Sequence, residues 1–156
     1  MKSLVDRKDR AVSDRNKNTF GKEWLAWEDP DVPEYFNPTN FVLDKHLATE
    51  KAKTTALVVD EESFSYEEFL GQVCRASNGL KALRIETGSR LLLFGTDSLE
   101  FLAIWFGAIR SAIVPVVVSD AYKAISLLYF LRDTAAKSLF IDAEQTGKLE
   151  EITEDT

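Results

Sequence analysis

The chain has 156 residues, of which 45% are hydrophobic and 29% are charged, a balance typical of one globular domain. Its formal charge of -7 and pI near 4.8 argue against a nucleic-acid or membrane-surface partner, because both attract clustered Lys and Arg. A single Cys and a single His exclude an internal disulfide and a zinc site built on Cys and His, and no apolar run reaches the roughly 20 residues of a membrane helix. We therefore expect a soluble, acidic protein of the cytoplasm.

Residues 1–34 differ in composition from the rest of the chain. They carry many charges of both signs, and their apolar side chains are scattered. Phe20, Trp24 and Trp27 have the i, i+4, i+7 spacing of one helical face, but two prolines then break any helix. We predict a charged, partly ordered N-terminal arm over residues 1–34 and a single α/β domain over residues 35–156.

The predicted domain begins with short elements. Phe41, Leu43 and Leu47 indicate a short helix. Thr55–Val59 is typical of a strand, and the polar run Asp60–Ser63 predicts the turn that ends it.

A long amphipathic helix is predicted next. Ser65 and Glu68 form a capping-box signature, in which the serine is the N-cap and the glutamate lies three residues further on. Apolar residues then recur at spacings of 4, 3, 4 and 3, which marks one helical face. They are Phe69, Val73, Ala76, Leu80 and Leu83.

Strands and helices alternate in the second half of the chain. The expected strands are Arg90–Phe94, Ile113–Val118 and Ser138–Asp142, the expected helices are Leu99–Ala112 and Lys123–Ala135, and an acidic helical tail ends the chain. The continuous apolar run of the second of these strands is typical of a strand covered on both faces. The alternation predicts an α/β fold, with a mostly parallel sheet of about four or five strands and helices on both faces.

The residues alone indicate no phosphate-binding site. Neither G-x-G-x-x-G nor G-x-x-x-x-G-K-[ST] is present. The turn Gly95–Ser98 joins a strand to a helix, but Asp97 is expected to cap that helix in a second capping box with Glu100 and to repel a phosphate.

Other reactive residue types are expected to have structural roles. His46 is predicted to be a surface or packing residue, and Cys74 a small buried hydrophobe. Glu61–Glu62 and Glu67–Glu68 are interpreted as turn and first-turn carboxylates rather than an acid/base pair. Composition leaves a Ser/His/Asp triad open, although no G-x-S-x-G elbow marks a nucleophile. We therefore predict no catalytic, cofactor-binding or metal-binding residue in this chain.

Four motifs follow one another along the domain: F-S-Y-E-E-F at Phe64–Phe69, T-G-S-R at Thr87–Arg90, G-T-D-S-L-E-F at Gly95–Phe101 and S-A-I-V-P-V-V-V at Ser111–Val118. In this order and spacing they resemble the N-terminal portion of the adenylate-forming acyl-CoA synthetase (AMP-binding enzyme) superfamily. The last motif is most similar to the benzoate-CoA ligase branch. The resemblance spans about residues 35 to 152.

The chain also departs from the family pattern. Ser111–Ala112 replaces the usual Ala-Gly, and a glycine expected near Arg84–Ile85 is missing. Some relatives place an arginine near the coenzyme A phosphates. The corresponding position here is Ala121, with Lys123 two residues on, so that role does not carry over.

The resemblance implies ATP, Mg²⁺ and coenzyme A as cofactors of a full-length relative. In such enzymes a carboxylic acid attacks ATP to give an acyl-adenylate, and coenzyme A then displaces AMP. The family's phosphate loop, adenine-binding motif and catalytic lysine lie beyond the point where this chain stops, so no cofactor is expected to bind the chain itself.

Two interpretations follow. In the first, the chain is an N-terminal fragment of an AMP-forming aryl- or acyl-CoA ligase, a scaffold that is inactive by itself and is completed by the missing C-terminal portion or by a complementing chain. In the second, it is a stand-alone α/β module that binds a partner without catalysis, an interpretation favoured by its acidic tail. In either case uncovered apolar surface is expected to favour homo-oligomers.

Overall fold

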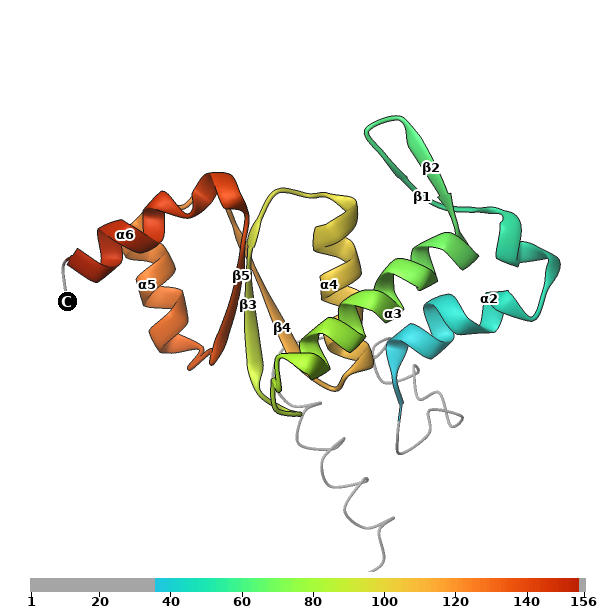
Figure 1. Ribbon diagram of the computed structural model, residues 1–156, viewed down its shortest axis with the longest axis horizontal. Coiled ribbons are helices and arrows are strands. Elements are labelled where there is room, and N and C mark those ends of the chain that lie inside the picture. Colours follow the sequence, from blue (N-terminus) through green and yellow to red (C-terminus); the bar gives the residue numbers. More distant parts are fainter. Residues whose placement is uncertain (1–35, 155–156) are drawn as a thin grey trace, which may run out of the picture. The chain divides into compact units, whose positions relative to one another are not determined.

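The computed structural model describes residues 36–154, and its part from Asn37 onward forms one compact unit (Figure 1). In chain order the elements are the π-helical turn η2 (Asn40–Asp44), α2 (Lys45–Leu47), the 3-10 turn η3 (Glu50–Lys53), β1 (Thr55–Val59), β2 (Glu62–Ser65), α3 (Tyr66–Ala82), β3 (Arg90–Gly95), α4 (Leu99–Arg110), β4 (Val114–Ser119), α5 (Ala124–Asp133), β5 (Ser138–Ile141), the 3-10 turn η4 (Ala143–Gln145) and α6 (Gly147–Glu154). The arm predicted for residues 1–34, with Phe20, Trp24 and Trp27, lies outside the described residues.

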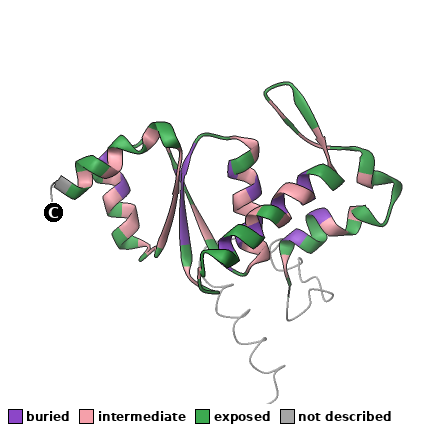
Figure 2. Cartoon of the chain, in the orientation of Figure 1, coloured by how far each residue is buried: buried purple, intermediate pink, exposed green. Residues whose placement is uncertain are grey.

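Three parallel strands form the central sheet, in the order β4-β3-β5. Leu92 of β3 lies opposite Val116 of β4 on one side and Leu139 of β5 on the other. Since β3 is the middle strand, its residues from Leu91 to Gly95 are all buried (Figure 2).

Helices cover both faces of this sheet. Successive side chains of β3 point to opposite faces, so they pack in two different clusters. Leu91 and Leu93 pack in one cluster with residues of α3 and α4, among them Leu80 and Phe101. Leu92 and Phe94 pack in another cluster with residues of α5 and α6, among them Leu127 and Leu149. The predicted α/β fold, with a parallel sheet and helices on both faces, is confirmed.

The helices α3 and α4 cross closely on the first face. Gly107 of α4 makes the approach possible, because a Cβ built on it would lie 2.9 Å from both the Ala76 Cβ and the Ser77 backbone nitrogen. The hydroxyl groups of Ser77 and Ser111 share a hydrogen bond of 2.8 Å beside this contact. Val73 lies fully buried in the adjacent cluster, as its position on the predicted stripe requires.

The strands β1 and β2 form an antiparallel hairpin that is separate from the parallel sheet. Asp60 and Glu61 make its two-residue turn, with φ values of 48° and 70°, and Val59 pairs with Glu62. The turn predicted over Asp60–Ser63 is therefore too long, and within residues 36–154 the parallel sheet has three strands rather than the expected four or five. The polar sequence of β2 and the absence of an Asn-Gly or Asp-Gly turn hid this hairpin.

Three further expectations were wrong in detail. Ser98, not Asp97, caps α4, and its hydroxyl accepts a hydrogen bond of 3.1 Å from the Phe101 amide. Leu83 follows the end of α3 and is 75% exposed, so it is not part of the buried stripe. Val117 is 54% exposed, because β4 is an outer strand of the described sheet and the described residues do not cover both of its faces.

A bidentate ion pair attaches the first helical segment to α4. The Arg110 guanidinium donates to both carboxylate oxygens of Asp44, at 2.6 and 2.9 Å. The Asn37 side chain donates to the Ile109 carbonyl oxygen at 3.1 Å.

Among residues 36–154, no helix is both long enough and apolar enough to cross a membrane.

Candidate functional site

The carboxyl ends of β3 and β5 form the place in this fold where a ligand would be expected first. The strands are neighbours, but β3 leads into α4 on one face of the sheet and β5 leads into α6 on the other. In open parallel sheets ligands bind at such a topological switch point.

The chain's own polar groups occupy this switch point. The backbone N–H of Thr96, just after β3, donates to a carboxylate oxygen of Asp142, just after β5, at 2.6 Å. Gly95 is needed for this approach, because a Cβ built on it would lie 2.7 Å from the other carboxylate oxygen. The amide that would face an anionic ligand is therefore already bonded to an internal anion.

The end of β4 is linked to the ends of β3 and β5 by further hydrogen bonds. The Thr96 hydroxyl donates to the Asp120 carboxylate at 3.2 Å, just after β4. The Lys148 ammonium, on α6, donates to the carbonyl oxygens of Asp120 and Tyr122 at 2.7 and 2.8 Å and lies 4.8 Å from the centre of the Phe94 ring. We call Thr96, Asp120, Asp142 and Lys148 the strand-end network, since it ties the ends of all three strands together.

The sequence indicated the turn Gly95–Ser98, but it pointed to Asp97 as the carboxylate at this turn, whereas the structure places Asp142 there. Asp97 is exposed beside the turn, and Glu100 is exposed in the first turn of α4. Asp142 was missed because it lies 46 residues from Thr96 in the chain. The signals that could have found it are a glycine and an aspartate, each ending a predicted strand of the same parallel sheet.

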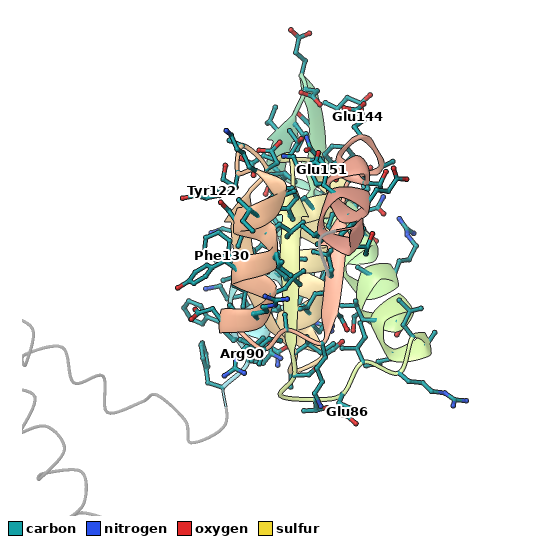
Figure 3. All side chains as sticks on the ribbon, turned by 90° about the vertical axis from the view of Figure 1, so that its left-hand side faces the viewer. Glu86, Arg90, Tyr122, Phe130, Glu144 and Glu151 are labelled. Atoms are coloured by element: carbon teal, nitrogen blue, oxygen red, sulfur yellow. The ribbon has the colours of Figure 1, made fainter. Side chains whose placement is uncertain are left out.

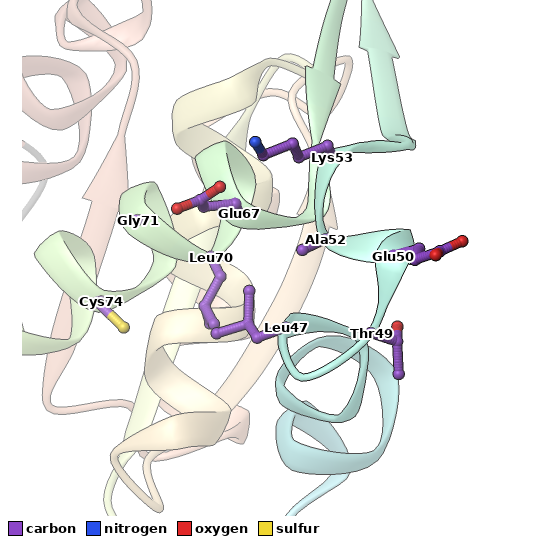
Figure 4. A pocket seen from close by; sticks show the side chains of 9 residues that line it. All are labelled: Leu47, Thr49, Glu50, Ala52, Lys53, Glu67, Leu70, Gly71 and Cys74. Atoms are coloured by element: carbon purple, nitrogen blue, oxygen red, sulfur yellow. The ribbon is translucent and has the colours of Figure 1, made fainter.

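Apart from the strand ends, a hollow lies between α3 and the segment from α2 to η3 (Figure 4). Its volume is about 660 Å³, and its lining includes the apolar Leu47 and Leu70 and the polar Glu67 and Lys53. Cys74, a free and half-buried thiol, also lies on its wall. Apart from this thiol, the lining consists of the core residue Leu70 and of half-buried or exposed side chains.

The other residues considered from the sequence lie apart from one another. The His46 ring packs on Tyr66, with the ring centres 4.4 Å apart. Partial burial, with the nearby charges of Lys45 and Lys51, lowers its pKa.

The carboxylates are distributed along the hairpin and α3. Glu61 lies in the hairpin turn and Glu62 begins β2. Glu67 and Glu68 lie in the first turn of α3, where the capping box of Ser65 and Glu68 is confirmed. The backbone N–H and the hydroxyl of Ser65 lower the pKa of Glu68 by donating to its carboxylate.

The described residues do not fit the ATP and Mg²⁺ that a full-length relative would bind. Within residues 36–154, no group of three or more His, Cys, Asp or Glu is placed to hold a metal ion. Ala121 is exposed after β4, and Lys123 is the exposed N-cap residue of α5. The strand-end network adds two carboxylates where a polyphosphate would need cations and free amides.

Comparison with known proteins establishes the family. The model of the AMP-binding enzyme family matches residues 43–156, and the chain belongs to this family. The solved structure of an anthranilate CoA ligase in complex with anthranoyl-AMP is similar, with a TM-score of 0.73 and 25% identity, over 81% of this chain and 24% of that one.

Curated relatives include ligases for both aromatic and short aliphatic acids. The 4-hydroxybenzoate--CoA/benzoate--CoA ligase of Rhodopseudomonas palustris is 30% identical over 122 residues, which are 78% of this chain and 22% of the relative. The acetyl-coenzyme A synthetase of Thiobacillus denitrificans is 30% identical over 147 residues, covering 81% of this chain and 22% of the relative. The chain thus spans about a fifth of the length of these relatives.

Proposed function

We propose that the chain is the N-terminal structural segment of an AMP-forming CoA ligase that acts on aromatic acids, of the benzoate-CoA ligase type. In this proposal the segment supplies scaffold and no catalytic group. The observation that carries it is the strand-end network. At the switch point of a sheet with the ligase fold, the Thr96 amide donates to the Asp142 carboxylate and the Thr96 hydroxyl donates to the Asp120 carboxylate.

The chemistry of such a ligase requires groups of a different kind. ATP, when bound, supplies the adenylyl group that activates the acid with release of pyrophosphate, and Mg²⁺ supplies the cation that offsets the charge of the polyphosphate. Here the charged and polar groups of the strand-end network hold three strand ends in place. We therefore assign positioning of the sheet, rather than catalysis, to this segment.

A scaffold of this kind needs a partner to complete it. We propose that the partner is the C-terminal portion of the ligase, on the same polypeptide or on a complementing chain. Both outer strands of the parallel sheet have an unpaired edge within the described residues, and Val117 of β4 is more than half exposed.

We also place the protein in the cytoplasm, whose reducing conditions suit the free thiol of Cys74.

The test compares the full chain alone and with a partner. We define the remainder polypeptide as the R. palustris ligase without the segment that this chain matches. The purified chain should show no carboxylate-dependent ATP–pyrophosphate exchange with benzoate or 4-hydroxybenzoate. Co-expression with the remainder polypeptide should give a complex that shows this exchange, whereas the remainder polypeptide alone should not.

Two results would contradict the proposal. Exchange by the chain alone would show that it contains an adenylation site. A stable complex without exchange would show that the chain is no ligase segment. The buried Val73 supplies a matched control, because Val73→Asp should abolish both complex and exchange, while Val58→Asp at an exposed hairpin position should leave both unchanged.

One observation favours a second candidate, a non-catalytic module that binds another protein. Ile125 and Tyr129 are exposed four residues apart on α5, and Tyr122, two residues before this helix, is exposed as well and is labelled in Figure 3. A compact monomer that ignores the remainder polypeptide would favour this function.

A further inference from the structure

The outer side of α5 carries large apolar side chains that stay exposed within the described part of the chain. Ile125 and Tyr129, one helical turn apart, are 66% and 60% exposed. On the opposite side of the helix Ala124 and Leu127 are buried, and Leu127 packs in the cluster that contains Phe94 of β3. The solvent side of a surface helix is normally charged or polar. The outer side of α5 therefore has the composition of an interface.

Aromatic contacts hold this surface in one shape. The Phe130 ring centre lies 5.4 Å from that of Tyr122 and 5.5 Å from that of Tyr129; Tyr122 and Phe130 are labelled in Figure 3. Side chains that are already ordered lose little conformational entropy when a partner binds. Arg132 is exposed in the last turn of the same helix. We call the following four residues the α5 face: Tyr122, Ile125, Tyr129 and Arg132.

The α5 face is complementary to itself about a two-fold axis at Leu127. Ile125 and Tyr129 lie at equal distances on either side of Leu127 in the chain, and so do Tyr122 and Arg132. An antiparallel pair of α5 helices therefore brings Ile125 of one copy to Tyr129 of the other. Arg132 lies two helical turns beyond Ile125, on the same side of α5. The Tyr122 ring lies on the other side, with Tyr129, because both pack on one aromatic neighbour.

The same two-fold axis places each Arg132 guanidinium beside the Tyr122 ring of the other copy. A guanidinium close to the face of an aromatic ring is attracted to it. Each of these contacts occurs twice, which is the property of an interface between identical surfaces. A second copy of the chain thus satisfies both the apolar and the charged residues of the α5 face.

The distribution of charge also favours a second copy at this place. The whole chain has a formal charge of -7, so two copies repel each other over much of their surface. The segment Lys123–Asp133 instead carries two cations and one anion. Two copies that meet through α5 therefore approach where their mutual repulsion is weakest.

We infer that the α5 face is the interface of a symmetric, antiparallel homodimer of this chain. A single helix pair buries less than the roughly 1,200–2,000 Å² of a standard stable interface, so the dissociation constant should be on the order of micromolar. A ligase segment and a binding module can each dimerise in this way. The inference is therefore independent of which function the chain has.

Sedimentation equilibrium of the purified full chain tests the dimer and its surface. The wild-type chain should show a monomer–dimer equilibrium. Ile125→Asp should raise the dissociation constant by about tenfold or more, because the dimer would bury the new charge. The free fold should be retained, since a carboxylate in the first turn of α5 suits the helix dipole. Val58→Asp adds the same charge at a 60% exposed hairpin position and should change the constant by less than about twofold.

Disulfide crosslinking tests the antiparallel arrangement. In a Cys74→Ser background, one preparation carries Tyr122→Cys and another carries Arg132→Cys. These positions lie at opposite ends of α5, a helix of 10 residues and about 15 Å, so the two-fold axis separates like positions of the two copies by a similar distance. Mild oxidation of the mixed preparations should therefore give a crosslinked dimer, whereas either preparation alone should give little.

The outcomes separate this inference from the proposed function. A chain that remains monomeric up to about 1 mM, far above a micromolar constant, overturns the inference. A dimer that Ile125→Asp leaves intact lies on another surface, and efficient crosslinking of either preparation alone shows another arrangement; both results overturn it.

The remainder polypeptide supplies the last test of the occupant. The crosslink should persist in the active complex. If the remainder polypeptide displaces the second copy, the α5 face binds the rest of the ligase, and the inference fails while the proposed function stands. A crosslinked dimer whose complex shows no exchange supports the inference and overturns the proposed function.

Discussion

The contact between Gly95 and Asp142 allows a sharp test of the strand-end network. In Gly95→Ala the added Cβ would lie 2.7–2.8 Å from the Asp142 carboxylate atoms, closer than two such groups can approach. Because these atoms are the end of a side chain, the carboxylate can rotate away. It would then lose its 2.6 Å hydrogen bond from the Thr96 amide.

The size of the effect follows from that lost bond. Hydrogen bonds to a charged group contribute about 1.5–3 kcal/mol to the free energy of unfolding. Alanine recovers up to about 1 kcal/mol of backbone entropy that glycine loses on folding. We therefore expect Gly95→Ala to lower the unfolding free energy by about 1–2 kcal/mol. Asp142→Ala should lower it by a similar or slightly larger amount.

The double variant decides whether the two residues act through this contact. With Asp142→Ala already present, Gly95→Ala has nothing to displace, so it should stabilise by up to about 1 kcal/mol through the entropy term alone. The coupling energy should then equal the lost hydrogen bond, about 1.5–3 kcal/mol. Urea unfolding followed by circular dichroism measures all four proteins. Gly71→Ala is the control, because a Cβ at Gly71 meets nothing within 4 Å and alanine favours helix α3. Additive costs for the two substitutions would refute the reasoning.

Three other substitutions test the packing and the capping. Gly107→Ala should cost about 1–3 kcal/mol of unfolding free energy, measured in urea, because its Cβ would meet the α3 backbone at 2.9 Å; a neutral effect would contradict the close crossing. Val73→Asp should cost several kcal/mol by burying a charge, and the chain should then lose its cooperative thermal transition, while the exposed Val58→Asp should melt almost unchanged. Hydrogen bonds from Ser65 lower the pKa of Glu68 in the folded state. The ionised carboxylate therefore stabilises the fold at pH values above its unfolded pKa of about 4.3. This stabilisation is lost as the pH falls through the lower pKa of the folded state. Glu68→Gln should therefore flatten the decline in melting temperature between about pH 5 and pH 3, and an unchanged profile would show that the capping box does not contribute.

Elements with a strong local signal could be predicted from the sequence. The capping box of Ser65 and Glu68 needs only a four-residue pattern, and the stripe through Phe69, Val73 and Leu80 needs only the helical period. The hairpin was hidden because Glu61, in place of a glycine, is an unusual residue at the second position of a turn in which both φ values are positive.

The candidate site was harder to predict, because its members meet only through the sheet. Thr96, Asp120 and Asp142 each follow a different strand, and nothing in their local sequence says which strands are neighbours. The N-cap of α4 was also placed one residue early, since both Asp97 and Ser98 can cap a helix and the backbone of the preceding turn decides between them.

The sequence by itself determined the alternation of strands and helices and the identity of the buried helical stripe, since hydrophobic period and capping act over a few residues. Only the tertiary structure decided that β3 lies between β4 and β5, which are the outer strands among the described residues. The apolar runs of β3 and β4 look alike, yet Leu92 is fully buried and Val117 is more than half exposed. Burial in a sheet depends on which strands lie on either side, and that is fixed by the faces on which the connecting helices pack.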